Sequence, residues 1–482
     1  MATQWSSLQS NIFEYVEHGT GNAIVEAVAG SGKTTTIVEA LGRVSGSSIF
    51  LAFNKAIAEE LKSRGVNART FHSLTYSPVM RARNARTVTT DKIRRIISER
   101  MTGEEIGLYG SFVMKLVGLG RQAGLGCLVP ESEQEWLTLC EYHDLEPEHI
   151  NATISEGIRF ASQLLKWSNE SSAVDFDDLL YFAVKDGIVL PRFDVVFVDE
   201  AQDTNAIQRA ILRKIMHAKS RLIAVGDPAQ AIYGFRGADS DSLGLIAQEF
   251  DCTSLPLSIT YRCPTSVVEY ARQWVGHITA APGAPAGEVK DLGTTWKHSD
   301  FQLNDLVVCR KTAPLVALAY SFIRARKPVQ MLGREIGAGL KALIQKMNVR
   351  TIDALEEKLD SYRQREVEKA LAKKDEQKAE AIEDKCNAIL CLVEGLPEDN
   401  RTTSALAGAI DDIFADKANA VRLATIHKAK GLEADRVFWL GRSECPAKWA
   451  RQQWQQEQEI NLCYVAATRA KKSLYLIETA KK

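Results

Sequence analysis

The residues with the clearest chemistry lie in the stretch EAVAGSGKTTT, residues 26–36. Its Gly32-Lys33-Thr34 matches the end of the phosphate-loop pattern G-x-x-x-x-G-K-[ST], although Ala27 stands at the first glycine position. Successive backbone N–H groups of such a turn can surround phosphate oxygens, and a lysine ammonium adds positive charge. The alternative is a chance glycine-rich turn. The lysine and threonine follow in register after an apolar run, which favours the phosphate site.

A second stretch, DVVFVDEAQDT, places two acids directly after an apolar run. A carboxylate at the end of a strand beside a phosphate loop can hold Mg²⁺, and we expect this role for Asp199, with the Thr34 hydroxyl as a second ligand. Glu200 is then placed to orient or deprotonate an attacking water. The alternative is that the two acids only complement the N-terminus of a following helix.

Short apolar runs alternate with helical patterns in two separate regions, which predicts two parallel sheets with crossover helices. The first set of expected strands is 23–28, 48–53, 193–198 and 221–225, and the second is 305–308, 421–425, 436–440 and 473–477. Ligands of such sheets bind at the carboxyl ends of the strands. Both chemical stretches occupy such ends.

The bulk composition limits the classes of protein. The 482 residues suggest two to four domains, and 45% apolar with 25% charged residues is typical of a soluble globular protein. The formal net charge of −1 gives the protein no overall positive field that would attract nucleic acid, but it does not exclude a local basic groove. The nine cysteines contain no C-x-x-C pair, so we expect free thiols in a reducing compartment. No signal peptide or membrane span is indicated, which predicts an intracellular protein.

Two regions interrupt the alternating pattern. Residues 76–174 are helical and mixed, and residues 336–418 include two apolar seams at helical spacing, separated by AKKDEQKAEA. For the second region, one interpretation is one or two solvated helices with balanced charge pairs, and the other is a lever or a hairpin that docks a partner.

The motifs in their order resemble superfamily 1 DNA helicases of the UvrD/Rep/PcrA type. From Gln9 to Arg469 they are AGSGKT, FNKAIAEEL, TFHSL, DFDDLL, VDEAQDTN, VGDPAQAIYGFRGA, TYRC, ATIHKAKGLE and YVAATRA. The FNKAIAEEL and TFHSL segments are also similar to the F-box DNA helicase and phage-type branch. The family commonly carries alanine where Ala27 stands. The resemblance implies an α/β fold of two RecA-like P-loop NTPase domains with two helical insertions.

The same resemblance implies domain boundaries. Core domain 1A would comprise 1–75 and 175–262, and insertion 1B would be 76–174. Core domain 2A would comprise 263–335 and 419–482, and 336–418 would be a reduced insertion 2B, far shorter than in full-length relatives.

The resemblance also assigns nucleotide roles, with ATP and Mg²⁺ as cofactors. Gln9 would read the adenine edge, Tyr261 would stack on the base, Gln230 would sense the γ-phosphate, and Glu433 would lie near the ribose. Arg262 and Arg469 would reach the γ-phosphate from the second core domain, where guanidinium forks stabilise the transferring charge. The loop residues that would cradle the nucleotide are Ala29, Gly30, Ser31, Gly32, Lys33, Thr34 and Thr35. Thr35 departs from the arginine that many relatives carry.

For DNA, the resemblance implies a groove lined by aromatic and small polar residues. Its candidate residues are Asn54, Phe71, His72, Tyr233, Phe235, Arg236, His427 and Lys430. Base stacking on aromatic rings tolerates any sequence, as a motor that passes every base requires. Phe71 has an alternative role as a core residue, and Arg236 an alternative role as a brace of the groove.

The implied activity is that of an ATP-driven motor on single-stranded DNA. It would move 3′ to 5′ and unwind duplexes at single-strand/duplex junctions, working as a cytoplasmic monomer in a bacterium or phage-infected cell, with replication, repair, recombination or phage proteins as partners. One alternative is a translocase that strips proteins or remodels recombination intermediates and unwinds weakly. Another is a helicase-like regulatory subunit.

Overall fold

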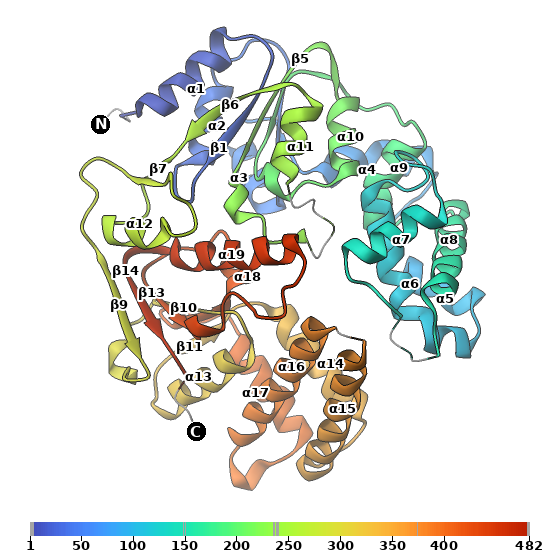
Figure 1. The fold of residues 1–482 in the computed structure, drawn as a ribbon, viewed down its shortest axis with the longest axis vertical. Helices are drawn as coiled ribbons and strands as arrows, with labels where there is room; N and C mark the ends of the chain where they lie inside the picture. Colours follow the sequence, from blue (N-terminus) through green and yellow to red (C-terminus); the bar gives the residue numbers. More distant parts are fainter. Residues whose placement is uncertain are drawn as a thin grey trace. The chain divides into compact units, whose positions relative to one another are not determined.

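The computed structural model describes residues 4–147, 149, 151–234, 237, 241–373 and 375–479. The chain divides into two compact units (Figure 1). Unit 1 comprises Met1–Ala27 and Gly32–Ser258, and unit 2 comprises Val28–Ser31 and Ile259–Lys482. Within the described residues, no helix combines the length and apolar character needed to cross a membrane.

Unit 1 is built on a parallel sheet of strand order β3-β2-β4-β5-β1-β6. Its strands are β1 (Asn22–Ala27), β2 (Ser48–Leu51), β3 (Ala68–Arg69), β4 (Phe193–Val198), β5 (Met216–Gly226) and β6 (Cys252–Leu257). Its helices are α1 (Ser7–His18), α2 (Lys33–Leu41), α3 (Lys55–Ser63), α4 (Phe71–Ala82), α5 (Lys92–Arg100), α6 (Gly103–Ala123), α7 (Glu133–Tyr142), α8 (Ile154–Glu170), α9 (Phe176–Lys185), α10 (Ala206–Lys214) and α11 (Ser242–Glu249).

Both faces of this sheet are covered, which explains the continuous apolar run Val195–Val198 in its strand β4. Along β4, Val195 and Phe197 pack in one core with residues of α1, α2 and α3. Val196 and Val198 point to the opposite face and pack in another core with residues of α4, α9, α10 and α11. Because successive strand side chains alternate between faces, a doubly covered strand reads as a continuous apolar run.

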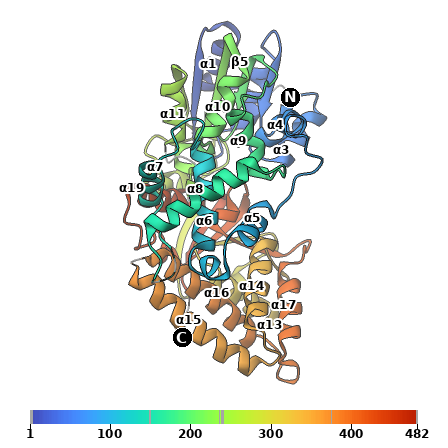
Figure 2. The same cartoon turned by 90° about the vertical axis from the view of Figure 1, so that its right-hand side faces the viewer.

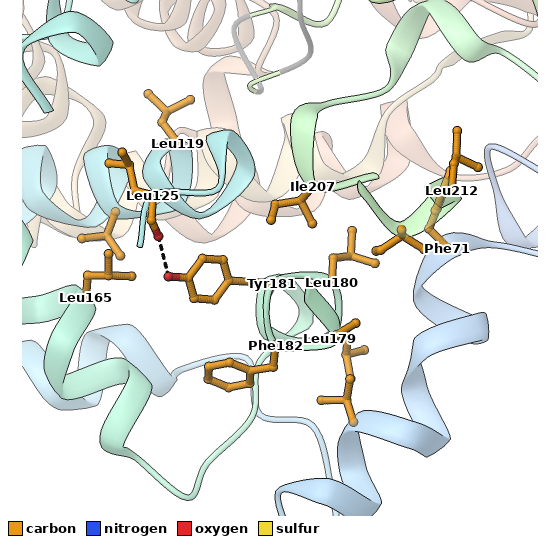
Figure 3. Packing of buried hydrophobic residues seen from close by; sticks show 14 of the residues in the cluster. Phe71, Leu119, Leu125, Leu165, Leu179, Leu180, Tyr181, Phe182, Ile207 and Leu212 are labelled. Atoms are coloured by element: carbon orange, nitrogen blue, oxygen red, sulfur yellow. Dashed lines mark hydrogen bonds between the residues drawn. The ribbon is translucent and has the colours of Figure 1, made fainter. Parts of the chain in front are cut away.

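Helix α9 joins the sheet to the helices α5–α8. Figure 3 shows Leu180 directed toward Ile207 and Phe71, while Tyr181 points the other way and donates a hydrogen bond to the Leu125 carbonyl at 2.6 Å. A large apolar core surrounds both side chains.

A buried charged network reinforces the same junction. The Lys92 ammonium of α5 lies 2.6 Å from the Asp178 carboxylate of α9, and both side chains are inaccessible to solvent. Arg121 of α6 pairs with Asp175 at 2.9 Å and donates to Ser168 at 2.7 Å. Burial lowers the pKa of Lys92 and raises that of Asp178, although each partner's charge opposes these shifts. Charges buried this deeply need their partners, so the network specifies how these helices pack.

Unit 2 contains a second parallel sheet, of order β11-β12-β10-β13-β14-β9. Its strands are β9 (Glu288–Gly293), β10 (Leu306–Cys309), β11 (Val329–Met331), β12 (Val421–Thr425), β13 (Ala434–Leu440) and β14 (Ala470–Ile477), with a separate pair of β7 (Ile259–Thr260) and β8 (Thr279–Ala280). Its helices are α12 (Thr265–Ala271), α13 (Ala313–Arg324), α14 (Arg334–Met347), α15 (Ile352–Ala372), α16 (Glu376–Glu394), α17 (Thr403–Phe414), α18 (Ile426–Ala429) and α19 (Gln453–Ala467).

Helices α14–α17 lie together beside α13 (Figure 2). The two apolar seams of the sequence become the contact between α15 and α16, where Leu355, Leu359, Cys386 and Ile389 are buried in one core. The polar stretch between the seams ends α15 and begins α16. The two seams therefore lie in two packed helices, an arrangement that both interpretations allow.

The predicted fold class is confirmed: two parallel sheets flanked by helices. Strands Phe193–Val198 and Val421–Thr425 have the predicted bounds. The strand expected over 48–53 ends at Leu51, because the chain turns there into the N-cap of α3 at Asn54.

Candidate nucleotide site and nucleic-acid surface

The phosphate loop follows β1 and enters α2. Gly30 and Gly32 have φ of 72° and 78°, a left-handed conformation that glycine adopts without strain. Gly32 is the N-cap of α2 and supplies no side-chain cap. The first N–H groups of α2 are therefore not satisfied by a capping side chain, and an anion at this helix end can accept from them.

The acidic residues after β4 meet the end of this loop within unit 1. The Thr34 hydroxyl donates to the Asp199 carboxylate at 2.9 Å, and the Lys33 ammonium lies 3.1 Å from Glu200. Glu200 has φ of 51°, which is strained for a residue with a β-carbon. Such strain is typical of functional sites, where the surrounding structure holds a side chain in one direction.

Burial and neighbouring charges shift the ionisation of this cluster. Burial opposes the charge of Lys33, yet the carboxylates of Glu200, Asp227 and Asp199 raise its pKa overall. Burial and the charge of Glu200 raise the pKa of Asp199 to about 6, although Lys33 and the Thr34 hydrogen bond act in the opposite direction. A cation bound beside Asp199 would favour its ionised form.

The residues present fit ATP with Mg²⁺. Thr34 and Asp199 offer adjacent oxygen ligands, which Mg²⁺ prefers. Across the described residues no group of three or more His, Cys, Asp or Glu side chains could hold a metal ion. A Mg²⁺ ion here would therefore take its other ligands from phosphates and water, as in P-loop NTPases. Bound in this way, it would neutralise charge on the transferring phosphoryl group.

The third strand end of this region carries Gln230. It lies in the short turn η2 (Pro228–Gln230) after β5 and is buried. Its side-chain amide donates to Asp227, whose other carboxylate oxygen accepts from the Ala229 N–H at 3.1 Å. Gln202, in the turn η1 (Ala201–Asp203) after β4, donates to Glu200 and accepts from the Asp227 N–H at 3.0 Å.

Gln202 and Asp227 had no predicted role, although they belong to the motifs VDEAQDTN and VGDPAQAIYGFRGA. The available signal was a polar residue within four positions of a buried strand's carboxyl end.

Gln9, the candidate for reading adenine, is buried in α1. Its side-chain oxygen accepts from the Ser6 N–H at 3.0 Å in a capping box, and its amide donates to Thr36 at 3.0 Å. The side chain is therefore held against the first turns of α2. Thr35, between Thr34 and Thr36, is exposed.

In unit 2, the two candidate arginines meet at Thr468. Arg262 donates to Glu433 at 2.8 Å and to the Thr468 carbonyl at 3.4 Å. Arg469, which is buried, donates to the Val465 carbonyl at 2.9 Å and to the Thr468 hydroxyl at 3.2 Å. Glu433 also pairs with Lys471 at 2.6 Å. The charge on this acid is thus shared between two cations.

Tyr261, the candidate for base stacking, is 48% exposed. Its N–H donates to the Gly30 carbonyl at 2.8 Å, a contact within unit 2 because Val28–Ser31 belongs to that unit. A β-carbon on Gly30 would lie 2.4 Å from the Arg262 β-carbon. Close approach and the positive φ therefore both require glycine at this position of AGSGKT.

A second feature of unit 1 is a cavity of about 370 Å³ that aromatic side chains line. Phe53 and Tyr233 are nearly parallel, with an interplanar angle of 13° and ring centroids 6.1 Å apart. His72 lies across the same cavity and contacts the ring of Phe176 edge-on, at 6.3 Å. Phe53 is 47% exposed and Phe176 is 55% exposed. Phe53 lines the cavity among mostly polar side chains, whereas Phe176 reaches it only through its contact with His72. An exposed ring such as Phe53 offers a surface for base stacking.

The other DNA candidates of unit 1 differ in their surroundings. Phe71 is 7% exposed and packs in the apolar core, so the structure favours its alternative role in packing. Asn54 accepts from the Ile57 N–H at 2.9 Å and caps α3. Phe235 and Arg236 lie outside the described residues. Sequence reasoning missed Phe53 and Phe176, although both stand in quoted motifs; an aromatic residue beside a polar strand end or helix cap was the available signal.

In unit 2, His427 lines a cavity of about 390 Å³ and lies in α18, after β12. Lys430 follows α18 as its C-cap and is half-buried. Side chains of α14 and α16 line the same cavity, among them Glu335, Glu380 and Asp384. Lys428 pairs with Glu335, and Lys311 lies 3.1 Å from Glu380. The carboxylates of these helices thus neutralise cations that follow β10 and β12.

The two parallel sheets and the phosphate loop define a P-loop NTPase with two RecA-like domains. Residues 8–251 match the family described as UvrD/REP helicase N-terminal domain, and residues 350–481 match the UvrD-like helicase C-terminal domain. The chain therefore belongs to the UvrD/REP family of superfamily 1 DNA helicases.

Individual relatives are distant. A probable DNA helicase II homolog of Mycoplasma pneumoniae is 23% identical, over 95% of this chain and 82% of the relative. An ATP-dependent DNA helicase PcrA of Staphylococcus epidermidis is 25% identical, over 56% of this chain and 40% of the relative. F-box DNA helicase protein 1 of Schizosaccharomyces pombe is 25% identical, over 95% of this chain and 56% of the relative.

Proposed function

We propose that this chain is an ATP-dependent DNA helicase that moves 3′ to 5′ along single-stranded DNA and unwinds duplex at junctions. The observation that carries the proposal is the content of unit 1. Its Lys33–Thr34–Asp199–Glu200 cluster and the Phe53–Tyr233 cavity follow strands of one sheet. The loop after β5 contributes to both, since it contains Gln230 and then Tyr233.

In this mechanism, Lys33 and the first N–H groups of α2 bind the outer phosphates, and Glu200 orients the attacking water. Arg262 and Arg469 complete the site on the γ-phosphate when the two core domains close on ATP, as the family resemblance implies. Their charge favours phosphoryl transfer only in the closed state, so hydrolysis and reopening follow each other in a cycle. The two core domains then grip the stacked bases alternately, and this alternation converts the hydrolysis cycle into movement along the DNA.

Strand separation tests the proposal. A fluorescently labelled duplex with a 3′ single-stranded tail should be unwound with ATP and Mg²⁺, and a duplex with a 5′ tail should not. Lys33→Ala should unwind neither. Preference for the 5′ tail would contradict the polarity, and turnover that persists in Lys33→Ala would contradict the site.

A second candidate is a translocase that displaces proteins and unwinds weakly. The alignment with the Mycoplasma pneumoniae relative extends over 589 positions, more than the 482 residues of this chain, so the relative carries segments that this chain lacks. A reduced insertion 2B, which we propose for 336–418, is consistent with such a loss. Displacement of streptavidin from biotinylated single strands, without strand separation, would favour this candidate.

The regulatory-subunit alternative predicts DNA-independent binding, without DNA-stimulated ATP hydrolysis. The complete cluster of Lys33, Thr34, Asp199 and Glu200 argues against it. We further infer that the protein works as a monomer in the cytoplasm of a bacterium or phage-infected cell, beside replication or repair proteins.

A further inference from the structure

Gln202 joins two strand ends of unit 1 through its side chain. It is 1% exposed, its Nε2 group donates to Glu200 Oε2, and its Oε1 atom accepts from the Asp227 N–H at 3.0 Å. A backbone N–H can only donate, so the amide oxygen must face Asp227 and the amide nitrogen must face Glu200. The hydrogen-bond partners therefore fix which end of the Gln202 amide is oxygen and which is nitrogen.

The end of β5 is shaped to admit this side chain. A β-carbon on Gly226 would lie 2.5 Å from Gln202 Oε1 and 3.1 Å from its backbone nitrogen. Any larger residue at 226 would push the amide out of place. Glu200 is thus held from two sides, by Gln202 at one oxygen and by Lys33 at 3.1 Å from the other.

The hydrogen bonds continue from Gln202 into the loop after β5. The Asp227 carboxylate accepts hydrogen bonds from the Gln230 side-chain amide and from the Ala229 N–H. Three residues later, Tyr233 lines the aromatic cavity and faces Phe53. One continuous set of contacts therefore runs from Glu200 through Gln202 and Asp227 to the loop that contacts this cavity.

We propose that Gln202 is a positioning residue that aims Glu200 and transmits occupancy of the Phe53–Tyr233 cavity to it. A base stacked on Tyr233 would move or stiffen the loop that carries the Asp227 N–H. Because the Gln202 amide is bonded at both ends, a shift of that N–H changes the direction of Glu200. The inference rests on the proposed function, since it assumes that Glu200 orients water and that the cavity takes single-stranded DNA.

Three substitutions test the amide itself. Gln202→Glu keeps the size and the acceptor for Asp227 but turns a carboxylate toward Glu200. Gln202→Met keeps the volume and removes both hydrogen bonds, and Gln202→Asn keeps the amide on a shorter side chain. We expect kcat for ATP with saturating oligo(dT) to fall about 10- to 100-fold in the Glu and Met variants, with KM for ATP changed less than about threefold. The Asn variant should recover part of the loss.

Thr204→Val is the matched control. The Thr204 hydroxyl bonds to the Ala201 carbonyl and contacts Ser242 in the same buried loop. It therefore reports on loop stability while leaving the Gln202 amide in place, and its kcat should stay near the wild-type value. Thermal unfolding of every variant shows whether a lower kcat results from a loss of folded protein. If the Met variant does not fold, the Glu and Asn variants still test the role of the amide.

A double-mutant cycle tests transmission. Tyr233→Ala should reduce the stimulation of turnover by oligo(dT), and adding Gln202→Met should reduce it by much less than the product of the two single effects. Independent, multiplicative effects would overturn transmission. The positioning role of Gln202 would be overturned if Thr204→Val lost as much kcat as Gln202→Met. It would also be overturned if Gln202→Glu and Gln202→Met kept the wild-type kcat while Lys33→Ala was inactive. Turnover retained in Lys33→Ala itself would instead refute the proposed function.

Discussion

The two sheets share a parallel topology, but the charged residues beside them differ in sign and in the strand ends that carry them. In unit 1, strand ends present the acids Asp199, Glu200 and Asp227 around one lysine. In unit 2, Arg469 directly precedes β14 and donates to the Val465 carbonyl, and Arg262 follows β7 and donates to Glu433. Acids beside a phosphate loop can hold a metal ion with the nucleotide, whereas guanidinium groups contact phosphate oxygens and neutralise their charge. We therefore propose that the acids and Lys33 of unit 1 hold the nucleotide and that the arginines of unit 2 promote phosphoryl transfer.

Removing the binding side should have the largest effect on activity. Lys33→Ala takes away the ammonium that the acids hold beside the phosphate loop, and we expect ATP turnover to fall by at least about 1,000-fold. Steady-state release of phosphate with oligo(dT) measures this loss. Lys62→Ala, at an exposed lysine of α3, is the control and should retain full turnover.

The next largest effect concerns stability and contrasts a buried pair of unit 1 with an exposed pair of unit 2. Lys92→Met leaves Asp178 without its ammonium partner in the interior, and we expect the free energy of unfolding to fall by about 3–5 kcal/mol. Lys428→Met removes the partner of Glu335 at the surface and should cost less than about 1 kcal/mol. Urea titrations followed by circular dichroism compare them, and equal losses would show that burial does not decide the cost.

These side-chain partners mark the limit of what the sequence could predict. Apolar runs located strands such as Phe193–Val198, because a strand covered on both faces buries consecutive apolar side chains, here Val195–Val198. The order of the strands depends on contacts between distant segments, so the Gln202–Asp227 bond across β4 and β5 had no local signal. Arg121 likewise finds Asp175 fifty-four residues away. The domain boundaries and the roles of individual site residues stay predictions.

Removing the arginines of unit 2 should impair catalysis while sparing binding. Arg262→Ala and Arg469→Ala should each lower kcat about 100-fold or more, with the affinity for a fluorescent ATP analogue nearly unchanged. Lysine should not restore the rate at either position, because the planar guanidinium group donates two parallel hydrogen bonds to phosphate oxygens and an ammonium group cannot. An equal loss of affinity would mean that unit 2 also binds the nucleotide strongly.

The smallest effect is expected at the aromatic cavity of unit 1. Phe53→Ala removes an exposed ring beside Tyr233 and should weaken oligo(dT) binding by about 1–3 kcal/mol, because one stacking surface is lost. Phe71→Ala, at the neighbouring buried ring, should instead destabilise the fold and serves as the contrast. Fluorescence anisotropy of labelled oligo(dT) gives the affinities. Unchanged binding in Phe53→Ala would remove this cavity from the DNA path.

We propose that unit 1 carries both the Lys33–Glu200 side of the ATP site and a surface for single-stranded DNA, and that occupancy of each affects the other. The most direct test of this central claim is the rate of ATP hydrolysis by the wild-type chain with and without oligo(dT). We predict stimulation of at least about 10-fold, since an oriented Glu200 supplies a general-base effect of this size or larger. Equal rates, with oligo(dT) binding demonstrated in the same solution, would contradict the account.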